Sequence, residues 1–95
     1  MHATTVVTED GVTTVTYHST PVVTWVQKED LVILDVGAML WFTPTTKNRM
    51  NQTATEFGLP YAVYQKSHDW FVRVRHDDGT YEDIPWQGRR MTIEW

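Results

Sequence analysis

The chain has 95 residues, with 12 Asp or Glu residues, 8 Lys or Arg residues and a formal net charge of −4 at pH 7. At this length the hydrophobic core is limited, and the absence of cysteine excludes disulfide bonds that would reinforce it. The acidic balance argues against a binder of duplex DNA, which normally carries a basic surplus.

The N-terminal segment predicts a β-hairpin. Valine and threonine dominate residues 6–7 and 12–17, and both residue types suit a pleated, half-buried strand. Between these runs lies Glu9-Asp10-Gly11, in which Asp-Gly supplies the positive φ angles of a tight turn. We therefore expect two antiparallel strands that meet at this turn.

Three further strands are expected before the middle of the chain. Pro21 interrupts the pattern and is followed by the β-favouring residues 22–26. Residues 31–34 are a continuous apolar run, typical of a central strand that is buried on both faces. Gly37 can turn the chain, and the apolar residues 38–42 then predict another strand.

A single helix over about residues 45–57 is indicated by signals at both of its ends. Thr43 is a suitable N-cap, and Pro44 fits the first helical position, where its missing N–H costs little. Gly58 suits the left-handed residue that follows a helix, and Pro60 prevents continuation.

The expected helix has one narrow apolar stripe and a broad polar remainder. Met50, Ala54 and Phe57 recur at the spacing of one helix face, which predicts that this face packs on a sheet. The polar residues that project elsewhere are Lys47, Asn48, Asn51, Gln52 and Thr55. They form either a solvated surface or a binding face, and the pattern alone does not choose between the two.

The second half of the chain predicts a β-meander. Strands are expected over residues 61–66, 70–75, 81–84 and 91–95, with turns at 67–69 and 77–79. Because side chains alternate along a strand, Phe71, Arg73 and Arg75 share one face. The complete order predicts a single small α+β domain over residues 1–95, in which one helix packs on an antiparallel β-sheet, with strands before the helix and the β-meander after it.

Several stretches resemble small, mostly uncharacterised proteins of tailed phages. The segments that carry the resemblance are Thr-Thr-Lys-Asn-Arg-Met-Asn-Gln at 45–52, Val-Tyr-Gln-Lys at 63–66 and Trp-Phe-Val at 70–72, with shorter matches at 17–20, 22–23 and 84–85. The resemblance implies a phage origin, and hence the cytoplasm of the host cell as the location. It implies no particular activity, cofactor or set of site residues.

The sequence predicts neither an enzyme nor a bound cofactor or metal. Ser67-His68-Asp69 contains the residue types of a catalytic triad, but neighbours in one turn cannot form the usual relay of hydrogen bonds. The four histidines lack the short paired spacing of a zinc site. Glu82 and Asp83 are adjacent in a strand and therefore point to opposite faces, so they do not form an acid–base pair.

Basic residues in two short segments predict an anion-binding site. Lys47 and Arg49 lie in the first turns of the expected helix, where free N–H groups and the helix dipole favour an anion. Arg73 and Arg75 present planar forks suited to phosphate, and Phe71 beside them can stack a base. The predicted ligand-binding residues are Lys47, Arg49, Asn51, Phe71, Arg73 and Arg75. The alternative is that the arginines form cross-strand ion pairs and the aromatic residues pack in the core.

Three functions are compatible with these patterns. The first is non-catalytic binding of a phosphate-bearing small molecule such as a nucleotide, by which a phage protein would sequester a host immune signal. The second is a protein-interaction module that inhibits or redirects a host protein through an aromatic surface. The third is binding of single-stranded nucleic acid, which the net charge disfavours.

The short chain also favours self-association. Small domains without disulfide or metal staples are commonly stabilised by oligomerisation, and aromatic residues are enriched at the cores of interfaces. We therefore expect a homo-oligomer. No apolar run approaches the roughly 20 residues that cross a bilayer, and no secretory signal opens the chain, so no membrane partner is expected.

Overall fold

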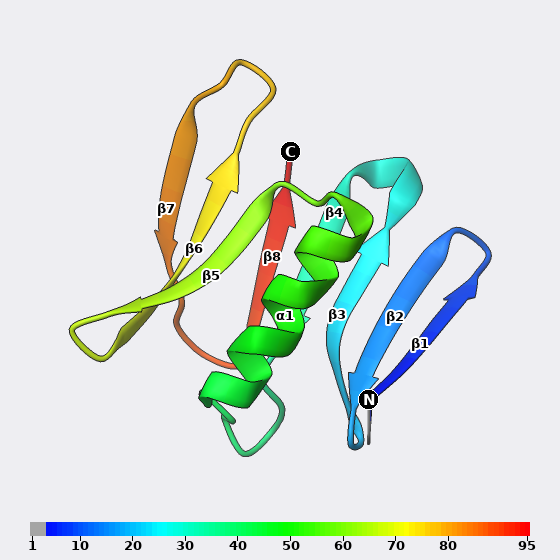
Figure 1. Ribbon diagram of the computed structural model, residues 1–95, viewed down its shortest axis with the longest axis horizontal. Coiled ribbons are helices and arrows are strands. Elements are labelled where there is room, and N and C mark those ends of the chain that lie inside the picture. Colours follow the sequence, from blue (N-terminus) through cyan, green and yellow to red (C-terminus); the bar gives the residue numbers. More distant parts are fainter. Residues whose placement is uncertain (1–3) are drawn as a thin grey trace.

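The computed structural model describes residues 4–95, which form two antiparallel sheets and one α-helix (Figure 1). Sheet A has the strand order β1-β2-β3-β4-β8, and sheet B has the order β5-β6-β7. The elements are β1 (Thr4–Glu9), β2 (Val12–Tyr17), β3 (Thr20–Val26), the 3₁₀ turn η1 (Gln27–Glu29), β4 (Leu31–Asp35), α1 (Pro44–Phe57), β5 (Tyr61–Lys66), β6 (Asp69–Arg75), β7 (Tyr81–Pro85) and β8 (Arg90–Glu94).

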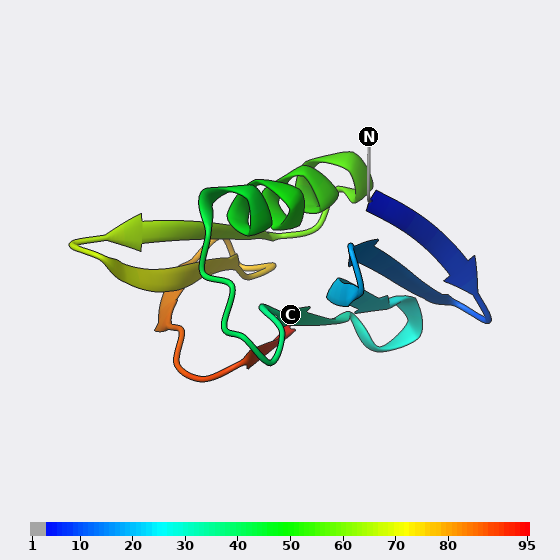
Figure 2. The ribbon, with the colours of Figure 1, turned by 90° about the horizontal axis from the view of Figure 1, so that it is seen from below.

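The hydrophobic core lies between sheet A on one side and α1 with sheet B on the other. Figure 2 shows α1 and β5 side by side in one layer, with β4 and β8 of sheet A in the layer below. Side chains from all three parts are fully buried there, among them Val23 and Leu34 of sheet A, Met50 of α1 and Val72 of sheet B. The two sheets are therefore held together by one shared core.

The predicted α+β fold and the predicted helix are confirmed. The helix begins at Pro44, and the hydroxyl of Thr43 accepts a hydrogen bond from the N–H of Thr46 at 3.2 Å. It ends before Gly58, which adopts a left-handed φ of 66° and donates its N–H to the carbonyl of Ala54. The apolar stripe also packs inward, with Met50 and Ala54 buried. None of the helices within residues 4–95 has the length and apolar character needed to cross a bilayer.

The strand predicted over residues 38–42 is wrong. After β4 the chain turns at Gly37, where φ is 85°, and runs through an irregular loop to the start of α1. Leu40 has a left-handed φ of 54°, and the N–H of Trp41 bonds back to the carbonyl of Val36 at 2.9 Å. The loop needs these bends because it carries the chain from sheet A across to the helix layer, and its apolar residues point largely into solvent.

The final strand does not extend the meander, since β8 pairs with β4 in sheet A. A buried carboxylate, that of Asp35, connects the start of β8 to the end of β4. Asp35 accepts hydrogen bonds from Nε of Arg89 at 2.9 Å and from Nε of Arg90 at 3.0 Å. Burial alone would raise the pKa of Asp35, but these bonds and one from the N–H of Gly37 outweigh burial and lower it. Asp35 therefore joins the end of β4 to the segment that arrives from sheet B.

Candidate functional site

One face of sheet B lies away from the core and carries aromatic and charged side chains. Along β6, Trp70, Val72 and Val74 are buried, whereas Arg73 and Arg75 are exposed. This alternation confirms that both arginines share one face of the strand. We call this surface the open face of sheet B and define it by the outward residues of its three strands, which are Ala62, Tyr64, Lys66, Asp69, Phe71, Arg73, Arg75, Tyr81, Asp83 and Pro85.

Arg73 is the centre of the open face. Its Nε and Nη2 donate to the two carboxylate oxygens of Asp83 at 2.8 and 3.2 Å, and the register places these two residues directly opposite each other. Its guanidinium carbon also lies 5.4 Å from the ring centroid of Tyr64 and 5.8 Å from that of Tyr81. The arginine is therefore held in one orientation by a bidentate ion pair and two aromatic rings.

A further aromatic contact lies beside Arg73 on this surface. The rings of Tyr64 and Phe71 stack with their centroids 5.4 Å apart and an interplanar angle of 18°. Desolvation and the nearby Asp83 raise the pKa of Tyr64. The hydrogen bond and charge of Asp83 in turn raise the pKa of Arg73. Tyr81 remains 64 % exposed at the rim.

The structure does not bring the four predicted cationic residues into one cluster. The backbone N–H of Arg75 bonds to the carbonyl of Pro60 at 2.9 Å, which places Arg75 beside the C-terminal end of α1. Lys47 and Arg49 lie toward the N-terminal end of the same helix, which spans about 20 Å. Arg49 packs over the ring of Tyr17 at 5.3 Å, on the side of sheet A. The four residues therefore do not lie together in the structure, and a phosphate site that uses all of them stays a prediction.

Asn51 has a structural role that the sequence did not reveal. Its Oδ1 accepts the N–H of Val63 at 2.7 Å, and its Nδ2 donates to the carbonyl of Val63 at 2.9 Å. The side-chain amide thereby pairs with β5 in the manner of a neighbouring strand. Both polar groups of Asn51 are engaged, so this residue anchors α1 to the edge of sheet B.

The N-terminal turn of α1 has few donors left for an anion. The hydroxyl of Thr43 accepts a hydrogen bond from the N–H of Thr46, and the carbonyl of Thr43 accepts one from the N–H of Lys47 at 3.0 Å. Pro44 has no N–H to offer. This end of the helix is therefore a weak phosphate site despite its favourable dipole.

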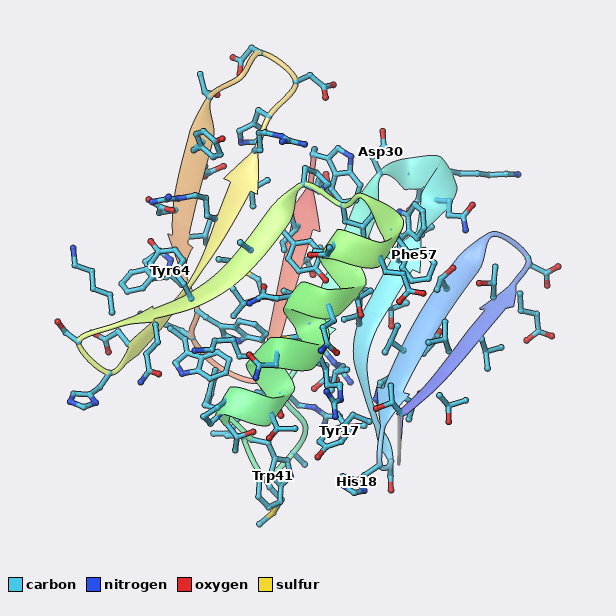
Figure 3. The ribbon with its side chains drawn as sticks, viewed as in Figure 1. Tyr17, His18, Asp30, Trp41, Phe57 and Tyr64 are labelled. Atoms are coloured by element: carbon cyan, nitrogen blue, oxygen red, sulfur yellow. The ribbon has the colours of Figure 1, made fainter. Side chains whose placement is uncertain are left out.

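A pocket of about 470 Å³ lies beside this helix end. It is lined by Tyr17, His18, Ser19, Thr20, Val22, Val36, Trp41, Thr43, Thr45 and Thr46. Figure 3 shows Tyr17, His18 and Trp41 below the first turn of α1. Neither lysine nor arginine lines the pocket, so its chemistry is aromatic and hydroxylic rather than cationic. Sequence reasoning missed it because the pocket joins the β2–β3 turn to the loop that had been predicted as a strand.

The segment Ser67-His68-Asp69, which contains the residue types of a catalytic triad, lies at the connection between β5 and β6. Ser67 and His68 form the turn between β5 and β6, with φ values of 51° and 71°, and both are exposed. Their positions are those of a tight hairpin turn. Within residues 4–95 no three His, Cys, Asp or Glu side chains gather closely enough to hold a metal ion.

Comparison with known proteins identifies the family of the chain. Residues 1–92 match the family described as Kyanoviridae Gp96 protein. The chain therefore belongs to this cyanophage protein family, which confirms the phage resemblance seen in its motifs. No curated protein and no solved structure matches the chain.

Proposed function

We propose that this member of the Kyanoviridae Gp96 family is a non-catalytic module that binds a protein of the host cell through the open face of sheet B. The observation that carries the proposal is the fixed Arg73, held by Asp83 between Tyr64 and Tyr81. Tyrosine and arginine dominate the binding energy of protein interfaces, and side chains that are already ordered lose little entropy on binding.

The charges of the open face fit a protein partner better than a phosphate. The positive charge of Arg73 is already paired with Asp83, and a phosphate would have to displace this carboxylate or approach beside it. On the same surface Lys66 lies opposite Asp69, whereas Arg75 lies opposite Tyr81, so the open face carries charges of both signs. A rim of mixed charge around aromatic residues is typical of protein interfaces.

Single-stranded nucleic acid fits this surface less well. Stacking platforms for bases are normally set in a positively charged groove that follows the backbone. Here the whole chain has a formal charge of −4, and the central arginine is neutralised by its partner. The rings of Tyr64 and Phe71 also stack on each other, which uses part of the area that a base would need.

The proposal is tested by recovering the tagged chain from infected host cells after chemical cross-linking. The double variant Arg73→Glu/Tyr81→Ala removes the ordered arginine and its exposed ring. The control is Thr14→Glu/Thr24→Ala, which places the same two new residues on the outward surface of sheet A. A host protein that is captured by the unaltered chain and by the control, but not by the open-face variant, supports the proposal. Equal capture by all three chains contradicts it.

A second candidate function is binding of a small, uncharged ring compound in the pocket beside α1. The favouring observation is the pocket itself, because its volume of about 470 Å³ lies within the usual range for ligand sites. Tyr17 and Trp41 offer faces for stacking, and the hydroxyls of Ser19 and Thr45 offer hydrogen bonds. This candidate retains a nucleoside-like ligand, but it moves the site away from Arg73 and Arg75 and does not require a phosphate group.

Titration with adenosine and with adenosine monophosphate separates this candidate from the original phosphate hypothesis. If the pocket is the site, adenosine raises the melting temperature at least as much as the monophosphate, and Trp41→Ala abolishes the shift. Met39→Ala is the matched control, since Met39 is exposed in the same loop but does not line the pocket. A response to the monophosphate alone, or one that survives Trp41→Ala, would exclude the pocket as a nucleoside site.

A further inference from the structure

The two sheets end in four edge strands, and these edges are protected to different degrees. An unprotected edge offers free N–H and C=O groups to another strand, and proteins usually block such edges with charge, proline, a short strand or a covering element. The edge strands are β1 and β8 in sheet A, and β5 and β7 in sheet B. The four edge strands differ in how many of these protections they carry.

Three of the edges carry such a device. The edge of β5 is occupied by Asn51, whose amide pairs with both backbone groups of Val63. Strand β7 is short, contains Glu82 and Asp83, and ends at Pro85. Strand β8 is equally short and has charged residues at both ends, Arg90 and Glu94.

Strand β1 has almost none of these protections. Its sequence is Thr-Thr-Val-Val-Thr-Glu, without lysine, arginine, proline or glycine, and the β1–β2 pairing contains no bulge. Val6 is 49 % exposed and Val7 is 51 % exposed. Within residues 4–95, β2 is the only strand that pairs with β1. Its outer edge is therefore a regular template for another strand, with a single charged residue, Glu9, at the turn.

We infer that β1 of one copy pairs with β1 of a second copy, joining two sheets A into one continuous antiparallel sheet across a two-fold axis. A second copy is the occupant because the edge is complementary to itself. When two copies of β1 run in opposite directions with Val6 opposite Val6, Thr4 lies opposite Thr8 and Thr5 opposite Val7, so only neutral residues meet at the centre. A contact that uses the same surface of both copies forms a closed dimer, and the β1 edge of each copy is then paired.

The hairpin fixes the register of this pairing. Asp10 and Gly11 have φ values of 53° and 78°, the signature of a two-residue hairpin turn, so Glu9 and Val12 are a hydrogen-bonded pair. Backbone groups alternate along a strand, and those of Thr4, Val6 and Thr8 therefore point away from β2. Pairing these residues requires Val6 opposite Val6 of the second copy and Thr4 opposite Thr8, which gives about six new backbone hydrogen bonds.

Charge and polar groups agree with this register. The antiparallel arrangement places the acidic turns at Glu9 and Asp10 at opposite ends of the seam, so like charges stay apart. The register also places Thr4 across from Thr8 of the second copy, and cross-strand threonine pairs are stabilising. The hydroxyl of Thr8 bonds to that of Thr13 within its own sheet at 2.8 Å.

The test is the mass of the full chain by sedimentation or light scattering over a concentration series. We expect a reversible dimer, because an interface built on one edge strand is small. Val6→Lys places two lysines opposite each other on the two-fold axis and gives a monomer at concentrations where the unaltered chain is dimeric. Val7→Lys is the matched control, since Val7 is equally exposed but faces Thr5 of the second copy, and this variant stays dimeric.

Two additional measurements separate a broken interface from a misfolded chain. The Val6→Glu variant by itself is also monomeric. An equimolar mixture of Val6→Glu and Val6→Lys restores the dimer mass, because opposite charges then face each other at position 6. The chain has no cysteine, so Val6→Cys forms a covalent dimer under mild oxidation, whereas Val7→Cys remains largely uncross-linked. A monomeric unaltered chain at high micromolar concentration, or equal behaviour of the substitutions at 6 and 7, would overturn the inference.

Discussion

Sheets A and B share one core but present different chemistry to the outside. On sheet A a row of neutral residues runs across all five strands on the side away from the core, namely Val7, Thr14, Thr24, Ile33 and Thr92. On sheet B the corresponding side carries Arg73 between two tyrosines and opposite Asp83. Sheet A is therefore suited to contacts through its backbone edge, and sheet B to contacts through ordered side chains.

Because of this difference, strand content alone does not predict which surface of a small β-rich protein binds its partners. Thr-Val strands form a regular edge with few distinguishing side chains, which suits pairing with an identical strand. Sheet B has both of its edges protected, and it places aromatic and charged residues on a face that is free of the core. The two surfaces can thus serve self-association and partner binding without competing.

The largest expected effect comes from removing the amide that protects the edge of sheet B. Asn51→Ala leaves the N–H and carbonyl of Val63 without their partner and removes one of the links between α1 and β5. We expect a loss of about 2–4 kcal/mol in the free energy of unfolding, which lowers the melting temperature by about 10–20 °C. Thermal and urea denaturation, followed by circular dichroism, would measure it.

Asn48→Ala is the matched control for this prediction. Asn48 lies one turn earlier on the same helix and is exposed. Its replacement should change the free energy of unfolding by no more than about 0.5 kcal/mol. Similar losses from both variants would contradict the prediction, because Ala is a better helix former than Asn and, within residues 4–95, Asn48 has no strand-edge partner to lose.

A smaller effect is expected from the buried carboxylate that ties β8 to β4. Asp35→Asn should cost about 1.5–3 kcal/mol at pH 7, toward the lower end because Arg89 and Arg90 are about half exposed and stay solvated. The pKa of Asp35 is lowered from its ordinary 3.8, so its contribution is complete above that value and is lost as the pH falls through the lower folded-state pKa.

Urea denaturation at pH 7 and at several values below pH 4 tests the predicted pH dependence. The stability difference between the unaltered chain and Asp35→Asn should shrink as the solution is acidified. Asp77→Asn, at an exposed turn position, serves as the control and should show a small difference at every pH. If Asp35→Asn lowered the free energy of unfolding by the same amount at every pH, the shape of the Asp35 side chain, and not its charge, would be what stabilises the fold.

The smallest effect on stability is expected from the open face itself. Tyr81→Ala removes a side chain that is largely exposed, and Arg73→Ala removes one half of a solvent-exposed ion pair. Neither change should lower the melting temperature by more than a few degrees, because exposed ion pairs contribute little to folding. Differential scanning fluorimetry would check this, and a large drop would indicate that this surface stabilises the fold instead of serving a partner.

Local signals in the sequence were sufficient for most of the fold. Thr43, Pro44 and Gly58 define the helix ends because capping depends on only a few neighbouring residues. The Asp10-Gly11 turn likewise determines its hairpin. The loop at 38–42 was misread because a short apolar run has no feature that separates a strand from an exposed connection.

The candidate site was predictable only in part. Alternation along β6 correctly placed Arg73 and Arg75 on one face. The pairing of Arg73 with Asp83 depends on the register between β6 and β7, which no local pattern encodes. The same is true of Asn51, whose partner Val63 lies on another element, and of the pocket at Trp41, which three separated segments assemble.

Site-specific photo-cross-linking in infected cells tests most directly whether sheet B binds a host protein through its open face. A photoreactive phenylalanine derivative in place of Tyr81 conserves the exposed ring, and the same residue in place of Thr24 reports on the outward surface of sheet A. We predict one discrete cross-linked host protein from position 81 and none from position 24. Cross-linking from position 24 alone, or the same products from both positions, would contradict it.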